Sequence, residues 1–196
     1  MGKRDFAARW ESGRLVLTEF AALAEYRLTG DTVRARVGHA SFLAARPEAR
    51  NTDLYAVTIA LLADVGKVRE AKLLHNEWPT RVTSADPSFR ADSAYAVGSI
   101  AAAEGQWDKA ATSFLVWNAS PMPSSFHWFN RGLAEAATAL ARLGNSDSSR
   151  VLLERALDSP SFALGWICET TWYPQALQQL GDSYDARGDR AKAASY

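Results

Sequence analysis

Five glycines at nearly regular intervals constrain the fold of this chain more than any other feature. Successive members are 36, 39, 39 and 44 residues apart: Gly30, Gly66, Gly105, Gly144 and Gly188. A small residue stands five positions after each glycine: Ala35, Ala71, Ala110, Ser149 and Ala193. A repeat of this length is typical of helical arrays in which each repeat is one supersecondary unit.

The residues around each glycine predict a helical hairpin. Glycine just past a helix end adopts the left-handed backbone conformation that closes the helix. A small residue one turn into the next helix lets the two helices approach closely. Pro87, Pro123 and Pro160 lie between successive glycine turns, each followed shortly by a phenylalanine, and proline cannot continue a helix. We therefore predict an all-α domain over residues 1–196, built from about five helix-turn-helix units, the last of them incomplete.

The residues around two of these turns match the residue pattern of a known repeat family. The better match is Leu177–Ala193, with Leu180, Gly181, Tyr184, Gly188 and Ala193. The second match consists of Gly98, Gly105, Ala110 and Phe114. With these residues the chain resembles the tetratricopeptide repeat family over about residues 15–196. The resemblance implies a right-handed α-solenoid that acts in protein–protein interaction, and the longer period predicts longer connections between units.

The closing segment Tyr173–Tyr196 also resembles the last repeat of large bacterial signalling proteins, such as those with Ser/Thr kinase modules. This second resemblance implies a scaffold or sensor segment of a larger regulatory protein, without catalysis of its own. It is compatible with a cytoplasmic location, and the alternative is the extracytoplasmic part of a membrane-anchored parent. Neither resemblance identifies the partner or the oligomeric state.

Composition and charge disfavour several other classes of protein. The chain has 22 basic and 22 acidic residues, whereas a nucleic-acid-binding array generally needs a basic face. A helical-repeat RNA binder is therefore the alternative, and a protein-binding module is the main hypothesis. The longest apolar stretch, Ala56–Ala63, is far shorter than the roughly 20 residues of a membrane span, and no signal peptide is expected at the start. The single cysteine excludes a disulfide within the chain.

The residues capable of chemistry do not form a recognisable catalytic or metal-binding pattern. The histidines are His39, His75 and His127, and the cysteine is Cys168. None stands at the spacing of a zinc site, and no phosphate-binding glycine loop or nucleophile elbow occurs. We expect packed or half-buried histidines, an inert thiol, no cofactor and no enzymatic activity.

The family resemblance places partner binding on the concave face of the first helices. Counting back from the turn glycines assigns Phe20, Tyr95 and Ser99 to that face, and Tyr95 and Ser99 share one side of a helix because they are four residues apart. Arg131 and Arg142 are eleven residues apart, which is about three turns, so they also point alike. An aromatic ring flanked by two arginines suits an extended peptide with an acidic or polar side chain. We predict partner binding at these five residues.

Aromatic residues in the longer connections form an alternative surface, consisting of Trp128, Phe129, Trp166 and Trp172. If these side chains are exposed, they would anchor a partner. If they are buried, they would fill space between irregularly spaced hairpins. The surroundings of Trp128 and Trp166 also leave open a small-molecule or enzymatic site.

Overall fold

The structure is a computed structural model that describes residues 3–45, 49–50, 52–81, 87–120, 131–158 and 172–196. These residues form helices and turns without a strand, which confirms the all-α prediction. The helices of the first three hairpins are α1 (Lys3–Thr29), α2 (Thr32–Ala44), α3 (Thr52–Asp64), α4 (Val68–Arg81), α5 (Pro87–Ala103) and α6 (Trp107–Asn118). Those of the remaining two are α7 (Arg131–Arg142), α8 (Ser146–Asp158), α10 (Tyr173–Ala186) and α11 (Arg190–Ala193).

All five predicted glycines lie in turns between consecutive helices and have φ angles between 72° and 80°. Four of the turns share a double hydrogen-bond pattern. At Gly66, for example, its own N–H donates to the Ala63 carbonyl at 3.0 Å and the Lys67 N–H donates to the Leu62 carbonyl at 2.8 Å. This is the Schellman motif, which satisfies the last free carbonyls of a helix and reverses the chain. The hairpins therefore arise from local backbone chemistry.

Small residues control how closely the helices approach. Ala71 and Ala110 are fully buried within their hairpins, as the repeat pattern predicts, and Ala35 and Ser149 are buried as well. Gly132 has a similar role between hairpins, because a Cβ atom there would lie 2.8 Å from the Phe114 carbonyl oxygen of α6. Ala193 in the short α11 is only half-buried, so the fifth hairpin packs less tightly than the others.

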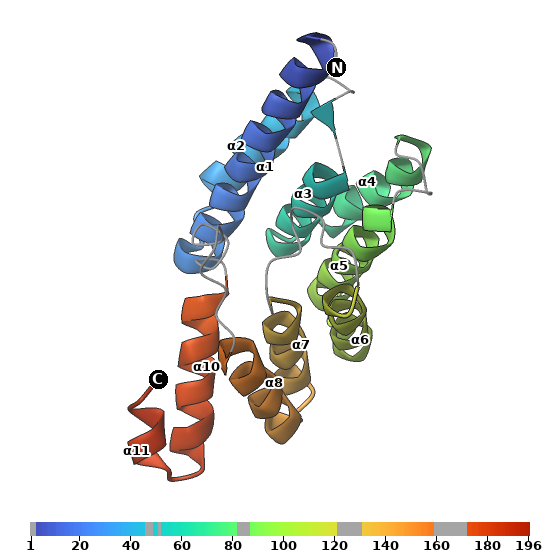
Figure 1. Cartoon of the computed structure of the whole chain (residues 1–196). Coiled ribbons are helices and arrows are strands. Elements are labelled where there is room, and N and C mark those ends of the chain that lie inside the picture. Colours follow the sequence, from blue (N-terminus) through green and yellow to red (C-terminus); the bar gives the residue numbers. More distant parts are fainter. Residues whose placement is uncertain (1–2, 46–48, 51, 82–86, 121–130, 159–171) are drawn as a thin grey trace.

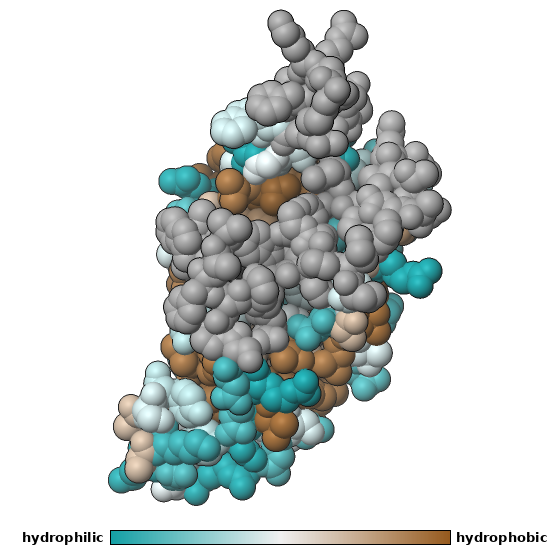
Figure 2. All heavy atoms as spheres, in the orientation of Figure 1, coloured by the Kyte–Doolittle hydropathy of each residue, from teal (hydrophilic) through white to brown (hydrophobic). Residues whose placement is uncertain are grey.

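The hairpins contact one another in sequence order (Figure 1). In the first half, α1 contacts α3 and α3 contacts α5; further on, α6 contacts α7 and α8 contacts α10. One hydrophobic core runs from α1 to α7, and a second lies among α7, α8 and α10. Figure 2 shows a mainly hydrophilic surface over α8, α10 and α11 at the lower end of the molecule.

Aromatic rings fill the space between the two helices of a hairpin within the first core. Tyr55 of α3 stacks on Trp78 of α4 with ring centroids 5.7 Å apart, and Tyr95 of α5 lies 4.5 Å from Trp117 of α6. Trp78 and Trp117 are both at most 1% exposed. Part of the high tryptophan content therefore serves packing.

Candidate functional site

An open hollow of about 380 Å³ lies where the C-terminal halves of α1, α3, α5 and α7 converge. Residues from α6 and α10 complete its wall. The lining residues are Tyr26, Arg27, Ala63, Asp64, Gly66, Ser99, Ala102, Ala103, Trp107, Phe114, Glu135, Thr138, Arg142 and Gln175. Most come from the first helix of a hairpin, so five consecutive units contribute to one site.

A network of ion pairs crosses this hollow. The Arg27 Nε lies 2.6 Å from an Asp64 carboxylate oxygen, and the Arg27 Nη1 lies 2.5 Å from Glu135 Oε1. The same Glu135 oxygen accepts a hydrogen bond from Arg131 Nε at 3.2 Å. These contacts tie α1 to α3 and α7, helices that are far apart in sequence.

The network extends into the core through Arg131. Its guanidinium donates a hydrogen bond to the Tyr95 hydroxyl and lies 4.9 Å from the centre of the Tyr95 ring and 5.8 Å from that of Phe20. Arg131 is 1% exposed, and its charge is balanced by Glu135. A buried charge with hydrogen bonds on several sides holds three helices in one register.

Burial and neighbouring charges shift the pKa values of these groups in opposite directions. Burial raises the pKa of Glu135, but Arg27 and Arg131 lower it by more, so it ends below its usual value. Burial lowers the pKa of Arg27, while Asp64 and Glu135 raise it well above its usual value. The pKa of Tyr95 rises to about 12, chiefly through burial. At neutral pH Arg27 and Glu135 are therefore ionised, while Tyr95 keeps its proton.

Arg142 supplies a further cation at the rim of the hollow. Its side chain is exposed, lies 5.8 Å from the centre of the half-buried Trp107 ring, and forms no ion pair with the other described residues. The neutral polar groups of the wall lie nearby, including Thr138, whose hydroxyl contacts the Gln179 amide at 3.1 Å. An arginine held over an aromatic ring presents its planar donors for a carboxylate.

The structure corrects the position of several predicted binding residues. Tyr95, Phe20 and Arg131 are 0–2% exposed, so they do not form the surface of a groove. The reason is that the Arg131 side chain of α7 reaches inward to Tyr95 of α5 and Phe20 of α1, so these groups contact one another inside the molecule. Tyr95 and Arg131, which were predicted to lie at one binding site, do contact each other, but inside the core.

The other two predicted residues lie at the hollow. Ser99 is 2% exposed and its hydroxyl donates to the Tyr95 carbonyl at 3.1 Å, while Arg142 is exposed at the rim. Arg27, Asp64, Glu135 and Trp107 were not predicted. A signal existed, because Arg27, Asp64 and Trp107 all stand within three residues of a turn glycine, nearer to it than the positions that the family rule selects.

The alternative aromatic surface is described only at Trp172. This residue is 3% exposed and packs in the second core, so it fills space between hairpins, which is the second of the two alternatives given above. Trp128, Phe129 and Trp166 lie outside the described residues.

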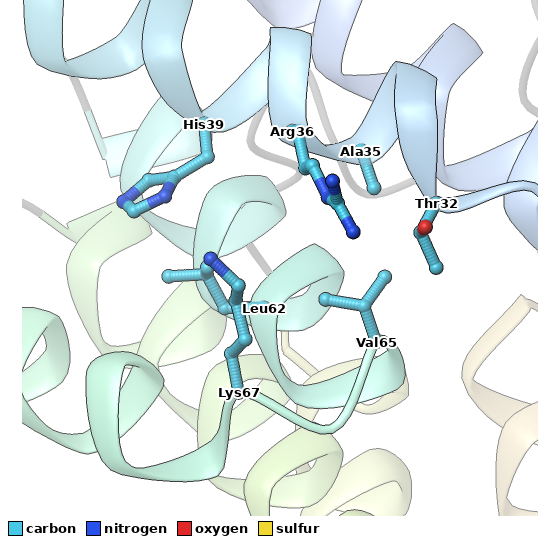
Figure 3. Close-up of a pocket in the computed structure, with 7 residues that line it drawn as sticks. All are labelled: Thr32, Ala35, Arg36, His39, Leu62, Val65 and Lys67. Atoms are coloured by element: carbon cyan, nitrogen blue, oxygen red, sulfur yellow. The ribbon is translucent and has the colours of Figure 1, made fainter.

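His39 lines a second, smaller hollow of about 90 Å³ between α2 and the turn at Gly66 (Figure 3). Arg36 and Lys67 extend toward the same space, and Lys67 Nζ pairs with Glu70 at 3.2 Å. Burial, and then Lys67, lower the pKa of His39. His75 is half-buried, and its Nε2 lies 3.2 Å from the Ser93 hydroxyl.

In the described ranges, no group of three or more histidine, cysteine or acidic residues could hold a metal ion. No described helix has the length and apolar character that crossing a membrane requires. His127 and Cys168 lie outside these ranges.

Comparison with known proteins provides no relative for this chain. It matches no family model, no curated protein and no solved structure.

Proposed function

We propose that this chain is a tetratricopeptide-like helical-repeat module, a right-handed solenoid whose inner face binds an extended peptide. The observation that carries the proposal is the 380 Å³ hollow, which is formed mainly by the first helices of five hairpins in succession. In a repeat array, the face shared by successive units is the extended concave surface available for binding.

The charges in the hollow favour a peptide with a carboxylate side chain. Arg27 and Arg131 are already balanced by Asp64 and Glu135. Arg142 has no such partner among the described residues and is stacked on Trp107. A carboxylate at the rim would pair with Arg142, and neighbouring apolar groups of the peptide would lie against Trp107 and Tyr26.

The scaffold role within a larger signalling protein, suggested by the sequence resemblance, fits this proposal. A module that contributes a binding face and no catalytic group would localise a partner for another domain. A few residues around the rim would contribute most of the binding free energy, because a small set of aromatic and arginine side chains usually dominates the binding energy of an interface.

The experiment begins with selection of peptides from a random displayed library on the immobilised chain. The selected peptide is then labelled, and its affinity is measured by fluorescence anisotropy for the parent, Arg142→Ala and Trp107→Ala. The matched control is Arg155→Ala, since Arg155 is an exposed arginine on α8 that does not line the hollow.

We expect acidic residues to be enriched in the selected peptides and Arg142→Ala to weaken binding about tenfold or more, as loss of a charge-assisted hydrogen bond does. Arg155→Ala should bind like the parent. Selected peptides without acidic enrichment, or equal affinity of the parent and Arg142→Ala, would contradict the proposal.

A further inference from the structure

The first hairpin exposes an unusual share of the large apolar side chains. Twelve such residues are exposed in the described parts of the chain, and six of them lie on α1 and α2: Trp10, Leu17, Leu28, Val33, Val37 and Leu43. Each of the six is at least 50% exposed. A concentration of exposed apolar groups on one hairpin marks an interaction surface.

The apolar residues of α1 form one stripe along the helix. Trp10, Leu17, Ala21 and Leu28 are all exposed and recur at intervals of seven, four and seven residues, the spacing of a coiled-coil seam. They lie on the side of α1 opposite the buried Ser12, Leu15 and Glu19, while the buried Phe20 and Ala24 lie along one edge of the stripe. The stripe therefore faces away from the core and from α3.

A second exposed apolar stripe lies on α2. Val33, Val37 and Ala40 are exposed, whereas Ala35 and Phe42 on the other side are buried. α3 contacts both α1 and α2, and each stripe lies on the side of its own helix that faces away from most of that helix's buried residues. Figure 1 shows that this hairpin projects at one end of the molecule, where a partner could reach it.

The spacing of the exposed apolar residues on α1 is the same from either end of the helix. If a second α1 is laid antiparallel with Trp10 opposite Leu28, then Leu17 falls opposite Ala21, and each large residue meets a smaller or complementary one. Such self-complementarity is what a two-fold symmetric interface requires, because the same patch must fit itself.

The charges along the stripe follow the same symmetry. Arg14 is four residues after Trp10, and Glu25 is three residues before Leu28, so antiparallel pairing brings Arg14 of each copy close to Glu25 of the other. Arg14 is exposed and forms no ion pair with another described residue. Glu25 is partly exposed and is held by Arg34 at 3.4 Å, which leaves a second carboxylate oxygen for Arg14.

We propose that the chain forms a symmetric dimer through α1, packed antiparallel against α1 of a second copy and flanked by the two α2 stripes. The interface is distinct from the proposed peptide site, because Tyr26 and Arg27, which line that site, lie on other sides of α1. A dimer of this form presents two binding hollows at once and raises avidity for a partner with two motifs.

Sedimentation velocity over a dilution series tests the dimer directly. The parent should sediment as a dimer that dissociates on dilution. Leu17→Glu should sediment as a monomer at concentrations where the parent is dimeric. The matched control is Leu73→Glu on α4, which replaces a leucine that is 61% exposed, against 50% for Leu17, and lies outside the stripe; it should leave the dimer intact. Circular dichroism checks that both variants keep their helical content.

Charge reversal and crosslinking test the antiparallel register. Arg14→Glu should weaken the dimer, and adding Glu25→Arg should restore it. In a chain with Cys168→Ser, a mixture of Leu17→Cys and Ala21→Cys should form the mixed disulfide in preference to either symmetric one. A monomeric parent at every concentration, a dimer unaffected by Leu17→Glu, or preferred crosslinking of Leu17→Cys to itself would overturn the proposal.

Discussion

Replacing Arg131 by methionine should destabilise the fold far more than replacing a rim arginine. Arg131 is 1% exposed, donates hydrogen bonds to Glu135 and to the Tyr95 hydroxyl, and lies over the rings of Phe20 and Tyr95. Methionine keeps much of the side-chain length but removes every one of these donors.

The magnitude follows from what the substitution leaves behind. Glu135 would keep Arg27 as a partner but lose its second cation, and the Tyr95 hydroxyl would lose its donor inside the core. Removing one member of a buried ion pair costs about 3–5 kcal/mol. For a chain of this length, that corresponds to a fall in melting temperature of roughly 6–20 °C.

Urea unfolding followed by tryptophan fluorescence measures this loss. Arg142→Met is the control, because Arg142 is exposed and its stacking on Trp107 is worth only about 0.5–1 kcal/mol. A double-mutant cycle with Glu135→Gln should give a coupling energy above about 1 kcal/mol. If Arg131→Met costs no more than Arg142→Met, then Arg131 is not a buried network residue and the position assigned to it here is wrong.

Three further predictions concern other parts of the fold. Gly132→Ala should cost about 1–3 kcal/mol in urea unfolding, because the new methyl group would meet the carbonyl of Phe114. Burial raises the pKa of Glu19 to about 8, so its ionisation disfavours the folded state; stability should fall as pH rises from about 4.5 to 8, and Glu19→Gln should remove this loss. Lys67→Gln should raise the pKa of His39, measured by an NMR titration of its ring, because Lys67 contributes to lowering it.

Each of these has a matched comparison. Gly13→Ala is the control for the glycine, since no atom lies within 4 Å of the added methyl group; equal stability of the two variants would refute the close approach of α6 and α7. A parent with unchanged stability between pH 5 and 9 would contradict the burial of an ionisable Glu19. Lys72→Gln, which lies on α4 five residues after Lys67 and is paired with Glu104, should leave the titration of His39 unchanged.

The hairpins could be predicted from sequence because their signals are local. A glycine that closes a helix and a small residue five positions later act through backbone conformation and close contact within one unit, and both were found where expected. Such signals do not depend on how distant units meet. The right-handed path of the array, which the resemblance to tetratricopeptide repeats also implies, depends on the angles between units and stays a proposal.

The site could be predicted only in part because it depends on contacts between distant units. Counting from the turn glycines selected Ser99, which lines the hollow, and the spacing from Arg131 selected Arg142, which lies at its rim. The same counting also selected Tyr95, which is buried in contact with Arg131 of α7. The ion pair between Arg27 and Glu135 joins residues that are 108 positions apart. Its charges have no local pattern, and only the folded arrangement shows that they cancel.

The most direct test of the central claim is an NMR titration of the isotopically labelled chain with a peptide selected as described above. A peptide bound on the inner face should shift the indole N–H of Trp107 and the backbone amides around Ser99 and Arg142, and it should leave Val37 on the outer stripe of α2 unperturbed. Shifts confined to α2 and α4, with the Trp107 indole unchanged at saturation, would contradict the claim that the hollow is the binding site.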